Sequence, residues 1–247
     1  MKTRMGFVFA ILALGLSTCA ARHVAPSPAA QPGSAFFDLH LKQGLSLFSL
    51  GEYGKAAAEL REAVAVNPGS FRAHNYLGLC YFQQNNYDLA GEEFEKAVEL
   101  DRSFATAYNN LGGVYAMKLQ FGKAEEMFKK ALSLSPDMIS ANYSLGMLLA
   151  NLGKEEGAAY LARGIALDPD YLEKNKEFIS TFTSLSFDMK EAYFAYAKVY
   201  ASVGNVDKTV AYLEKARKAG FSDWRRILED KIFEKIRDDP RIRKFLI

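Results

Sequence analysis

Hydrophobic residues recur along most of the chain at intervals of three and four positions, and short polar stretches with Gly or Pro separate the runs. This period places the apolar residues on one side of a helix. Tyr108 to Met117 and Ala124 to Leu134 are two such runs, joined by a short turn. Because each run has a single apolar side, we expect its two helices to pack as an antiparallel pair. The pattern therefore predicts an all-α chain built from helical hairpins.

The hairpin signal repeats at a fixed distance, because NYLGLCYF at residues 75–82 returns thirty-four residues later as NNLGGVYA. The matched positions are His74, Leu77, Gly78, Tyr81, Ala90, Phe94 and Ala97, then Tyr108, Leu111, Gly112, Tyr115, Ala124, Phe128 and Ala131, with Pro136 closing the second set. Their order resembles the tetratricopeptide repeat, which runs aromatic-x2-L-G-x2-Y, A-x3-F, P. The resemblance implies a TPR α-solenoid, a right-handed superhelix of helix-turn-helix repeats.

Three further units extend the resemblance. An upstream unit matches in Gly44, Gly51, Tyr53, Ala56, Leu60, Ala63 and Pro68, with His40 in place of the leading aromatic residue. A fourth unit, one residue short, matches in Leu145, Gly146, Gly153, Leu161 and Pro169, and a fifth matches in Tyr193, Tyr200, Gly204, Leu213 and Ala216. We therefore expect four units over residues 36–169 and a fifth over residues 190–222.

Glycine in the middle of a predicted helix calls for a physical reason. Gly78 and Gly112 each cost up to ~1 kcal/mol relative to alanine at such a position. Close approach of the second helix of the same hairpin, at Ala90 and Ala124, would offset that cost. We expect the large aromatic residues to fill the space that the small residues leave.

Two segments depart from the period. Residues 170–189 carry a helical stripe of Phe178, Phe182 and Leu185, so an inserted helix is expected there. It either packs across the solenoid or shapes a binding groove. Residues 223–247 resemble the closing helices of many bacterial repeat proteins. Apolar residues recur there at four-residue steps and would cover the last exposed face: Trp224, Leu228, Ile232 and Ile236.

The start of the chain indicates export. Two basic residues precede an uncharged run from Met5 to Leu16, which is too short to span a bilayer and predicts a signal peptide over residues 1–18. LSTC resembles the bacterial lipoprotein signal, in which Cys19 becomes the acylated first residue; ordinary cleavage just after Cys19 is the alternative. Residues 19–35 are rich in Ala, Ser, Gly and Pro and are expected to form a flexible tether. The expected location is the periplasmic face of the outer membrane.

Composition narrows the chemistry. The formal net charge is +2, and removal of the signal peptide with its two basic residues leaves a neutral chain, which argues against nucleic-acid binding. The sequence contains no P-loop, HExxH, GxSxG or paired CxxC motif, so no catalytic, cofactor or metal site is expected. His40 and His74 occupy equivalent positions and are interpreted as packing residues rather than metal ligands. Carboxylates such as Glu59 and Glu93 are placed on solvated outer faces, and Cys80 is expected to be a buried, unreactive thiol.

The resemblance implies that a partner binds in the concave wall, which the first helix of each unit forms. The candidate residues are Leu41, Leu45, Phe48, Arg72, Asn75, Leu79, Phe82, Gln83, Asn109, Met117, Tyr143, Met147, Phe194 and Lys198. The apolar early part suits an amphipathic helix or an extended peptide, whose backbone Asn75, Asn109 and Gln83 would hold. The alternative is that the tether or the inserted helix already fills the wall. Because Arg72 is the only basic residue of the early wall, a basic clamp for a terminal carboxylate is not expected there.

These observations predict a non-enzymatic scaffold or assembly factor of the bacterial cell envelope that binds a protein or peptide partner. Its layout resembles that of pilotin lipoproteins, which help type IV pilus secretins assemble, so a pilotin-like role is one alternative. A ligand-binding or regulatory subunit of an envelope enzyme is a second, and a self-associating scaffold is a third.

Overall fold

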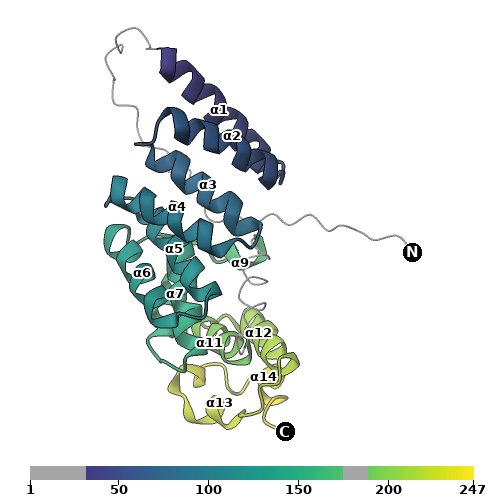
Figure 1. Cartoon of the computed structure of the whole chain (residues 1–247). Helices are drawn as coiled ribbons and strands as arrows, with labels where there is room; N and C mark the ends of the chain where they lie inside the picture. The colour runs from purple at the N-terminus through teal and green to yellow at the C-terminus, as the bar shows by residue number, and fades with distance from the viewer. Residues whose placement is uncertain (1–31, 175–188) are drawn as a thin grey trace, which may run out of the picture. The chain divides into compact units, whose positions relative to one another are not determined.

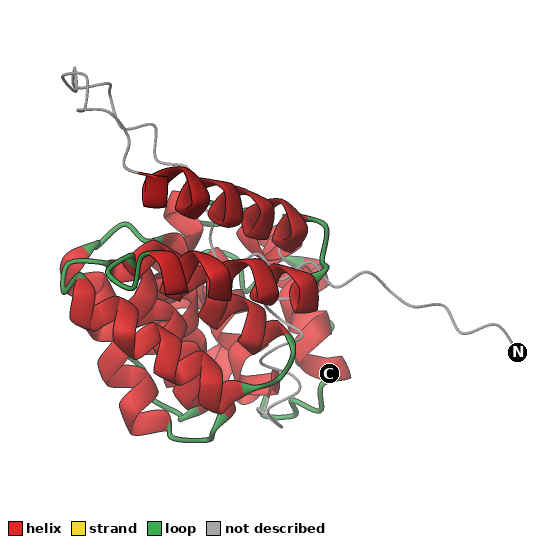
Figure 2. Cartoon of the chain, turned by 45° about the horizontal axis from the view of Figure 1, so that its top comes forward, coloured by secondary structure: helices red, strands yellow, loops and turns green. Residues whose placement is uncertain are grey.

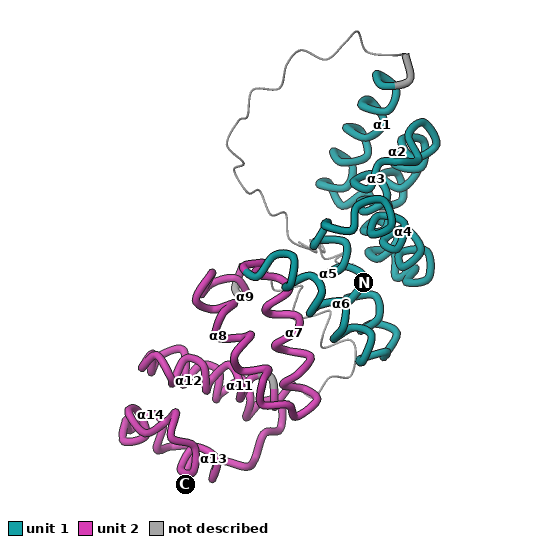
Figure 3. The backbone as a smooth tube through the Cα atoms, turned by 90° about the vertical axis from the view of Figure 1, so that its left-hand side faces the viewer, with its two compact units in different colours: residues 1–136 teal, residues 137–247 magenta. Residues whose placement is uncertain are grey.

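The computed structural model describes residues 32–174 and 189–247, and every regular element in these ranges is a helix (Figure 2). The all-α prediction is confirmed. The chain divides into two compact units, Met1–Pro136 and Asp137–Ile247 (Figure 3). The predicted signal peptide, Cys19 and most of the tether lie outside the described residues. Residues 175–188, the main part of the predicted insertion, lie outside them too.

Unit 1 consists of three helical hairpins in chain order (Figure 1). Their helices are α1 (Pro32–Ser49), α2 (Tyr53–Val66), α3 (Phe71–Gln83), α4 (Tyr87–Leu100), α5 (Ala105–Met117) and α6 (Phe121–Leu134). Each first helix packs on its own second helix, and α2 and α4 also contact the first helix of the following hairpin. Such consecutive pairs are typical of a tetratricopeptide solenoid. The tether was predicted to run to residue 35, but α1 already begins at Pro32, where a proline ring suits the first helical turn.

Unit 2 contains two longer hairpins and a C-terminal group of short helices. The hairpins are α7 (Ile139–Asn151) with α8 (Gly157–Leu167) and α11 (Met189–Ser202) with α12 (Val206–Lys218). The short elements are α9 (Tyr171–Lys174), α13 (Arg225–Glu229), the 3-10 helix η1 (Lys231–Phe233) and α14 (Pro240–Arg243). None of the helices described in either unit is long and apolar enough to cross a membrane.

The mid-helix glycines lie where two helices of a hairpin approach closely, as predicted. A Cβ atom added to Gly78 would lie 2.7 Å from the ring of Phe94, and one added to Gly112 would lie 2.6 Å from the ring of Phe128. The nearest neighbour is thus the large residue of the second helix, whereas the sequence pattern suggested the alanines Ala90 and Ala124. Gly44 and Gly146 approach a leucine in the same way.

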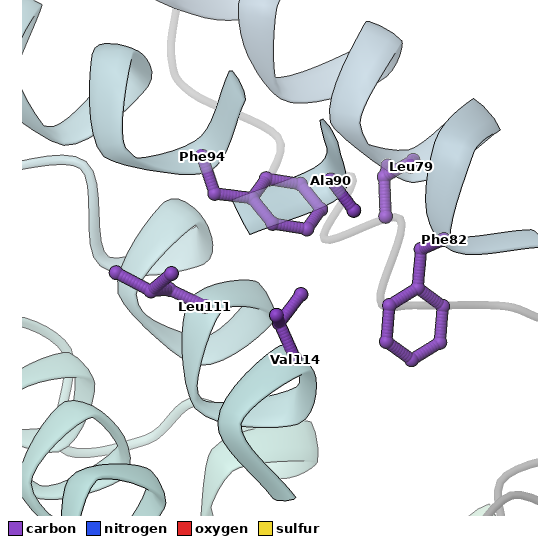
Figure 4. Packing of buried hydrophobic residues seen from close by; sticks show 6 residues of the cluster. All are labelled: Leu79, Phe82, Ala90, Phe94, Leu111 and Val114. Carbon is purple, nitrogen blue, oxygen red and sulfur yellow. The ribbon is translucent and has the colours of Figure 1, made fainter. Parts of the chain in front are cut away.

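The core of unit 1 forms where successive hairpins meet. Figure 4 shows one buried cluster, to which α3 contributes Leu79 and Phe82, α4 contributes Ala90 and Phe94, and α5 contributes Leu111 and Val114. A second cluster joins α2 and α3 and includes Cys80. Burial raises the pKa of the Cys80 thiol to about 12, so the predicted inert thiol agrees with its surroundings.

The turn between the helices of a hairpin needs one residue with positive φ. Gly51 and Gly153 supply it with φ of 75° and 69°. The corresponding residues of the two hairpins between them are Asn85 at 60° and Leu119 at 59°. Asparagine tolerates this left-handed region, but leucine does so only at a cost. The third hairpin is therefore closed by a residue that its turn geometry disfavours.

The C-terminal cap follows the predicted stripe only in part. Ile236 is buried, Trp224 and Ile232 are partly buried, and Leu228 is exposed. The other buried side chains of the cap are Ile227, Phe233, Ile242 and Phe245. Asp230 adopts an extended conformation and accepts a hydrogen bond from the Ile232 N–H at 3.0 Å, which ends α13 and begins η1. Because the helix is interrupted at Asp230, different residues face inward before and after it. The expected continuous stripe at four-residue steps is therefore not formed.

Candidate functional site

The candidate residues on α1 keep part of their surface accessible. Leu41, Leu45 and Phe48 follow one another at helical spacing and are each partly buried. Leu41 and Phe48 pack against the cluster between α2 and α3, and the Phe48 ring meets Tyr76 edge-on with 6.0 Å between centroids. The second hairpin thus fixes the orientation of this apolar strip.

Three other candidates of unit 1 are also accessible. Arg72 is exposed, and its guanidinium carbon lies 5.7 Å from the centre of the Phe71 ring. Gln83 and Met117 are partly buried near the ends of α3 and α5. The Gln83 Nε2 atom is buried and has no hydrogen-bond partner within the described part of the chain.

Leu79 and Phe82 were predicted to line the groove, but both belong to the buried cluster between α3, α4 and α5 (Figure 4). Their exposed fractions are 4% and 8%. The reason is that the following hairpin packs on this side of α3, so α5 covers positions that an isolated hairpin would leave open. Neither side chain offers a partner much surface.

Asn75 and Asn109 were predicted to hold a peptide backbone, and both are buried. Asn75 Oδ1 accepts a hydrogen bond from Asn110 Nδ2 at 2.9 Å, which links α3 to α5. The Oδ1 atoms of Asn109 and Asn110 are buried without a hydrogen-bond partner among the described residues. A buried acceptor left in this state costs about 1–3 kcal/mol. Asn110, absent from the predicted set, belongs to the same polar cluster.

In unit 2 the predicted groove residues on α7 belong to the core. Tyr143 is fully buried, its hydroxyl donates to the Asp168 carbonyl oxygen at 3.0 Å, and its ring stacks on Tyr171 with 5.0 Å between centroids. Met147 is 1% exposed. Tyr143 and Met147 therefore offer a partner no surface, and at Tyr143 the cover comes from Tyr171, in the segment that follows the fourth repeat.

The candidates on α11 have different environments. Phe194 is buried and stacks on Phe221 with 4.3 Å between centroids, so it also belongs to the core. Lys198 is partly exposed, and its Nζ lies 2.6 Å from Asp230 Oδ2. A cavity adjoins both residues, and Arg226 lines it too. Sequence reasoning missed Arg226 and Asp230, because they lie in the cap, outside the repeat pattern.

The two repeat histidines each face a glutamate nineteen residues later. His40 Nδ1 lies 2.8 Å from Glu59 Oε2, and His74 Nδ1 lies 2.6 Å from Glu93 Oε2. Glu93 was expected on a solvated outer face, but it is buried and also accepts a hydrogen bond from Lys96 at 2.9 Å. No group of three or more potential metal ligands occurs in residues 32–174 or 189–247.

Known proteins resemble this chain in repeat pattern and in fold. The tetratricopeptide repeat family model matches residues 41–103 and 118–171. No curated protein matches the sequence. Among solved structures, YrrB, a TPR protein with an unusual peptide-binding site, shares 22% identity at a TM-score of 0.50, covering 78% of this chain and 94% of that one. TTC0263, a TPR protein of Thermus thermophilus, shares 21% at a TM-score of 0.52, with coverages of 78% and 96%.

Pseudomonas aeruginosa pilF covers 84% of this chain and 99% of its own, with 18% identity and a TM-score of 0.52. At these identities the likeness establishes the fold. The repeat spacing, the paired helices, the glycine contacts and the family match agree with one another. The chain is a tetratricopeptide repeat protein.

Proposed function

We propose that this protein is a non-catalytic interaction scaffold of a bacterial cell envelope, tethered through an acylated Cys19, that binds a segment of another envelope protein on unit 1. Tetratricopeptide solenoids use the first helices of their repeats as extended binding surfaces. YrrB, which shares the fold, has a peptide-binding site, and this supports a peptide as the class of ligand. The proposed location in the cell envelope is supported by the sequence, through the predicted signal peptide and the LSTC stretch that ends at Cys19.

The apolar strip on α1 is the observation that carries this proposal. Leu41, Leu45 and Phe48 remain partly exposed on one side of a helix whose other contacts are made by α2 and α3. An amphipathic helix or an extended peptide with hydrophobic anchors would cover such a strip.

Introduction of a negative charge into the strip tests the proposal. Leu45→Glu places a carboxylate on the α1 strip, whereas Val66→Glu places one on an exposed apolar residue at the end of α2 and serves as the matched control. Both variants are expressed in the native envelope, crosslinked and isolated. We expect Leu45→Glu to lose a protein that the parent chain and Val66→Glu retain. Retention of every partner by Leu45→Glu would overturn the proposal. Phe82→Glu is unsuitable because it would place a charge in the core.

A pilotin-like role is a narrower form of the same proposal. The layout of a lipoprotein signal followed by helical repeats supports it. If it holds, deletion of the gene leaves secretin subunits unassembled, and Leu45→Glu reproduces that defect. If the deletion strain still assembles normal secretin rings, the pilotin role is excluded, whereas the general scaffold role is not affected by that result.

A further inference from the structure

Unit 2 contains a small cavity, of about 80 Å³, between the turn that joins α7 to α8, helix α11 and helix α13. Small residues on its lining, including Ala150, Gly153 and Ala195, leave this space open. A water molecule needs about 10–15 Å³ of such volume, so the cavity has room for a group the size of a carboxylate. The space lies wholly within one unit and does not involve the α1 strip.

Arg226 lines this cavity and is held firmly. Its Nη1 donates to Glu191 Oε2 at 2.8 Å, and its guanidinium carbon lies 4.5 Å from the centre of the Phe194 ring and 5.4 Å from that of Phe221. Stacking on two rings and one ion pair fix the plane of the guanidinium. Of its five N–H donors, only one has an acceptor among the described residues. The others are available to a ligand.

Lys198 is the second fixed cation. Its Nζ lies 2.6 Å from Asp230 Oδ2, which leaves further donors on the ammonium group. Burial raises the pKa of Asp230, but the hydrogen bonds from Lys198 and the Ile232 N–H outweigh it and hold that pKa below its ordinary value. Asp230 therefore stays ionised and keeps Lys198 in place.

The donors on the lining favour a carboxylate, because Arg226 and Lys198 keep N–H groups beyond those that bind Glu191 and Asp230. Three basic residues, Lys154, Lys198 and Arg226, contribute to the lining, against the two acidic residues Glu155 and Glu191. Glu191 is already bound to Arg226, so an incoming carboxylate would meet mostly donors. We propose that this cavity binds a carboxylate of a partner, from an acidic side chain or a chain end, as a second contact separate from the α1 strip.

The site is tested by NMR titration of the full ¹⁵N-labelled chain with three small probes. N-acetylglutamate α-amide carries a side-chain carboxylate, N-acetylalanine carries a main-chain carboxylate, and N-acetylglutamine α-amide is the neutral control. We expect saturable shifts of the Arg226 Nε–H and Ala195 amide signals with at least one carboxylate, which also identifies its source, and none with the amide. Equal shifts with all three probes, or none with any, would overturn the proposal.

Variants separate the site from general surface charge. Arg226→Gln and Lys154→Gln should each weaken binding of the carboxylate about tenfold through loss of one charged donor. Arg225→Gln removes the neighbouring exposed cation, which does not line the cavity, and should leave binding unchanged. Lys154 lies on an exposed turn, so its variant stays informative if loss of Arg226 disturbs folding. Binding by Arg226→Gln and Lys154→Gln as tight as by Arg225→Gln would contradict the assignment. Phe48→Glu in unit 1 should not affect it.

Discussion

The Nδ1 atom of His74 lies 2.6 Å from Oε2 of Glu93, and both side chains are buried in unit 1. His74 Nε2 lies 3.0 Å from the Pro68 carbonyl oxygen, so both ring nitrogens face acceptors. The repeat conventionally has an aromatic residue here. This hairpin replaces apolar packing with a buried polar pair that ties α3 to α4 and to the preceding turn.

The coupling free energy between His74 and Glu93 can be measured by replacing them with the residues at the equivalent positions of the next hairpin. Tyr108 and Met127 stand thirty-four residues after His74 and Glu93. Glu93→Met alone should cost about 1–3 kcal/mol, because it leaves Nδ1 of a buried imidazole without a partner. His74→Tyr with Glu93→Met should cost less than the sum of the two single variants. Urea denaturation of the four proteins measures the coupling, and strictly additive losses would show that the pair does not act together.

Adjacent glycines on α5 should respond in opposite directions. Gly112→Ala places a Cβ 2.6 Å from the Phe128 ring and should destabilise unit 1 by about 1–3 kcal/mol through overpacking. Gly113→Ala meets only Phe82 at 3.9 Å and should stabilise the helix by up to about 1 kcal/mol. The melting temperatures of the two variants check this. A rise for Gly112→Ala would contradict the packing role of that glycine.

Leu119 offers a stabilising substitution. It has a φ of 59° and is exposed, and its counterparts in the first and fourth hairpins are glycines. Leu119→Gly should raise the free energy of unfolding by about 0.5–1 kcal/mol, because glycine occupies the left-handed region without the steric cost. Leu100→Gly, at an exposed helical residue, is the control and should be destabilising. Loss of stability in both would show that the turn is not strained.

The ion pair of Lys198 with Asp230 predicts a pH dependence. Because the folded-state pKa of Asp230 is lowered, its contribution to stability is present above the ordinary value of 3.8 and is lost as the pH falls through the folded value. Asp230→Asn should therefore be less stable than the parent near pH 7, and the difference should shrink as the solution is acidified below pH 3.8. A difference that stays constant across this range would mean that the carboxylate charge is not what holds Lys198.

Cys80 should be protected in the folded protein. Its thiol is buried, and its raised pKa leaves almost no thiolate near pH 8. In a Cys19→Ser background, a disulfide reagent such as DTNB should modify Cys80 only after denaturation. Rapid modification under native conditions would show that α3 opens readily or that the side chain is not buried.

The sequence was sufficient to predict the hairpins and their close contacts. The spacing of Gly78 and Gly112 from Phe94 and Phe128 follows from one local geometry that repeats. The periodicity within a helix does not show which residues from other segments pack on it. It therefore did not reveal that Tyr171 packs on Tyr143 or that Phe221 packs on Phe194. On α1, whose contacts come from α2 and α3, the candidate side chains keep part of their surface accessible, and their role in binding stays a prediction.

Polar contacts between repeats were the other feature that periodicity did not reveal. Asn75 and Asn110 occupy different positions of their units, so alignment of the repeats does not pair them. Glu93 appears in a charged stretch that resembles a solvated helix face, and only its nineteen-residue separation from His74, repeated by Glu59 and His40, could have suggested the contact. Arg226 lies outside every repeat and gave no such signal.

Site-specific photocrosslinking in living cells tests the proposed binding surface most directly. A benzophenone amino acid is placed at Leu45 on the α1 strip in one strain and at Val66, the exposed apolar residue at the end of α2, in another. We expect a discrete crosslinked protein at position 45 that is absent at position 66 and disappears when Phe48→Glu is added. No crosslink at position 45, or the same products at both positions, would contradict the proposed binding surface.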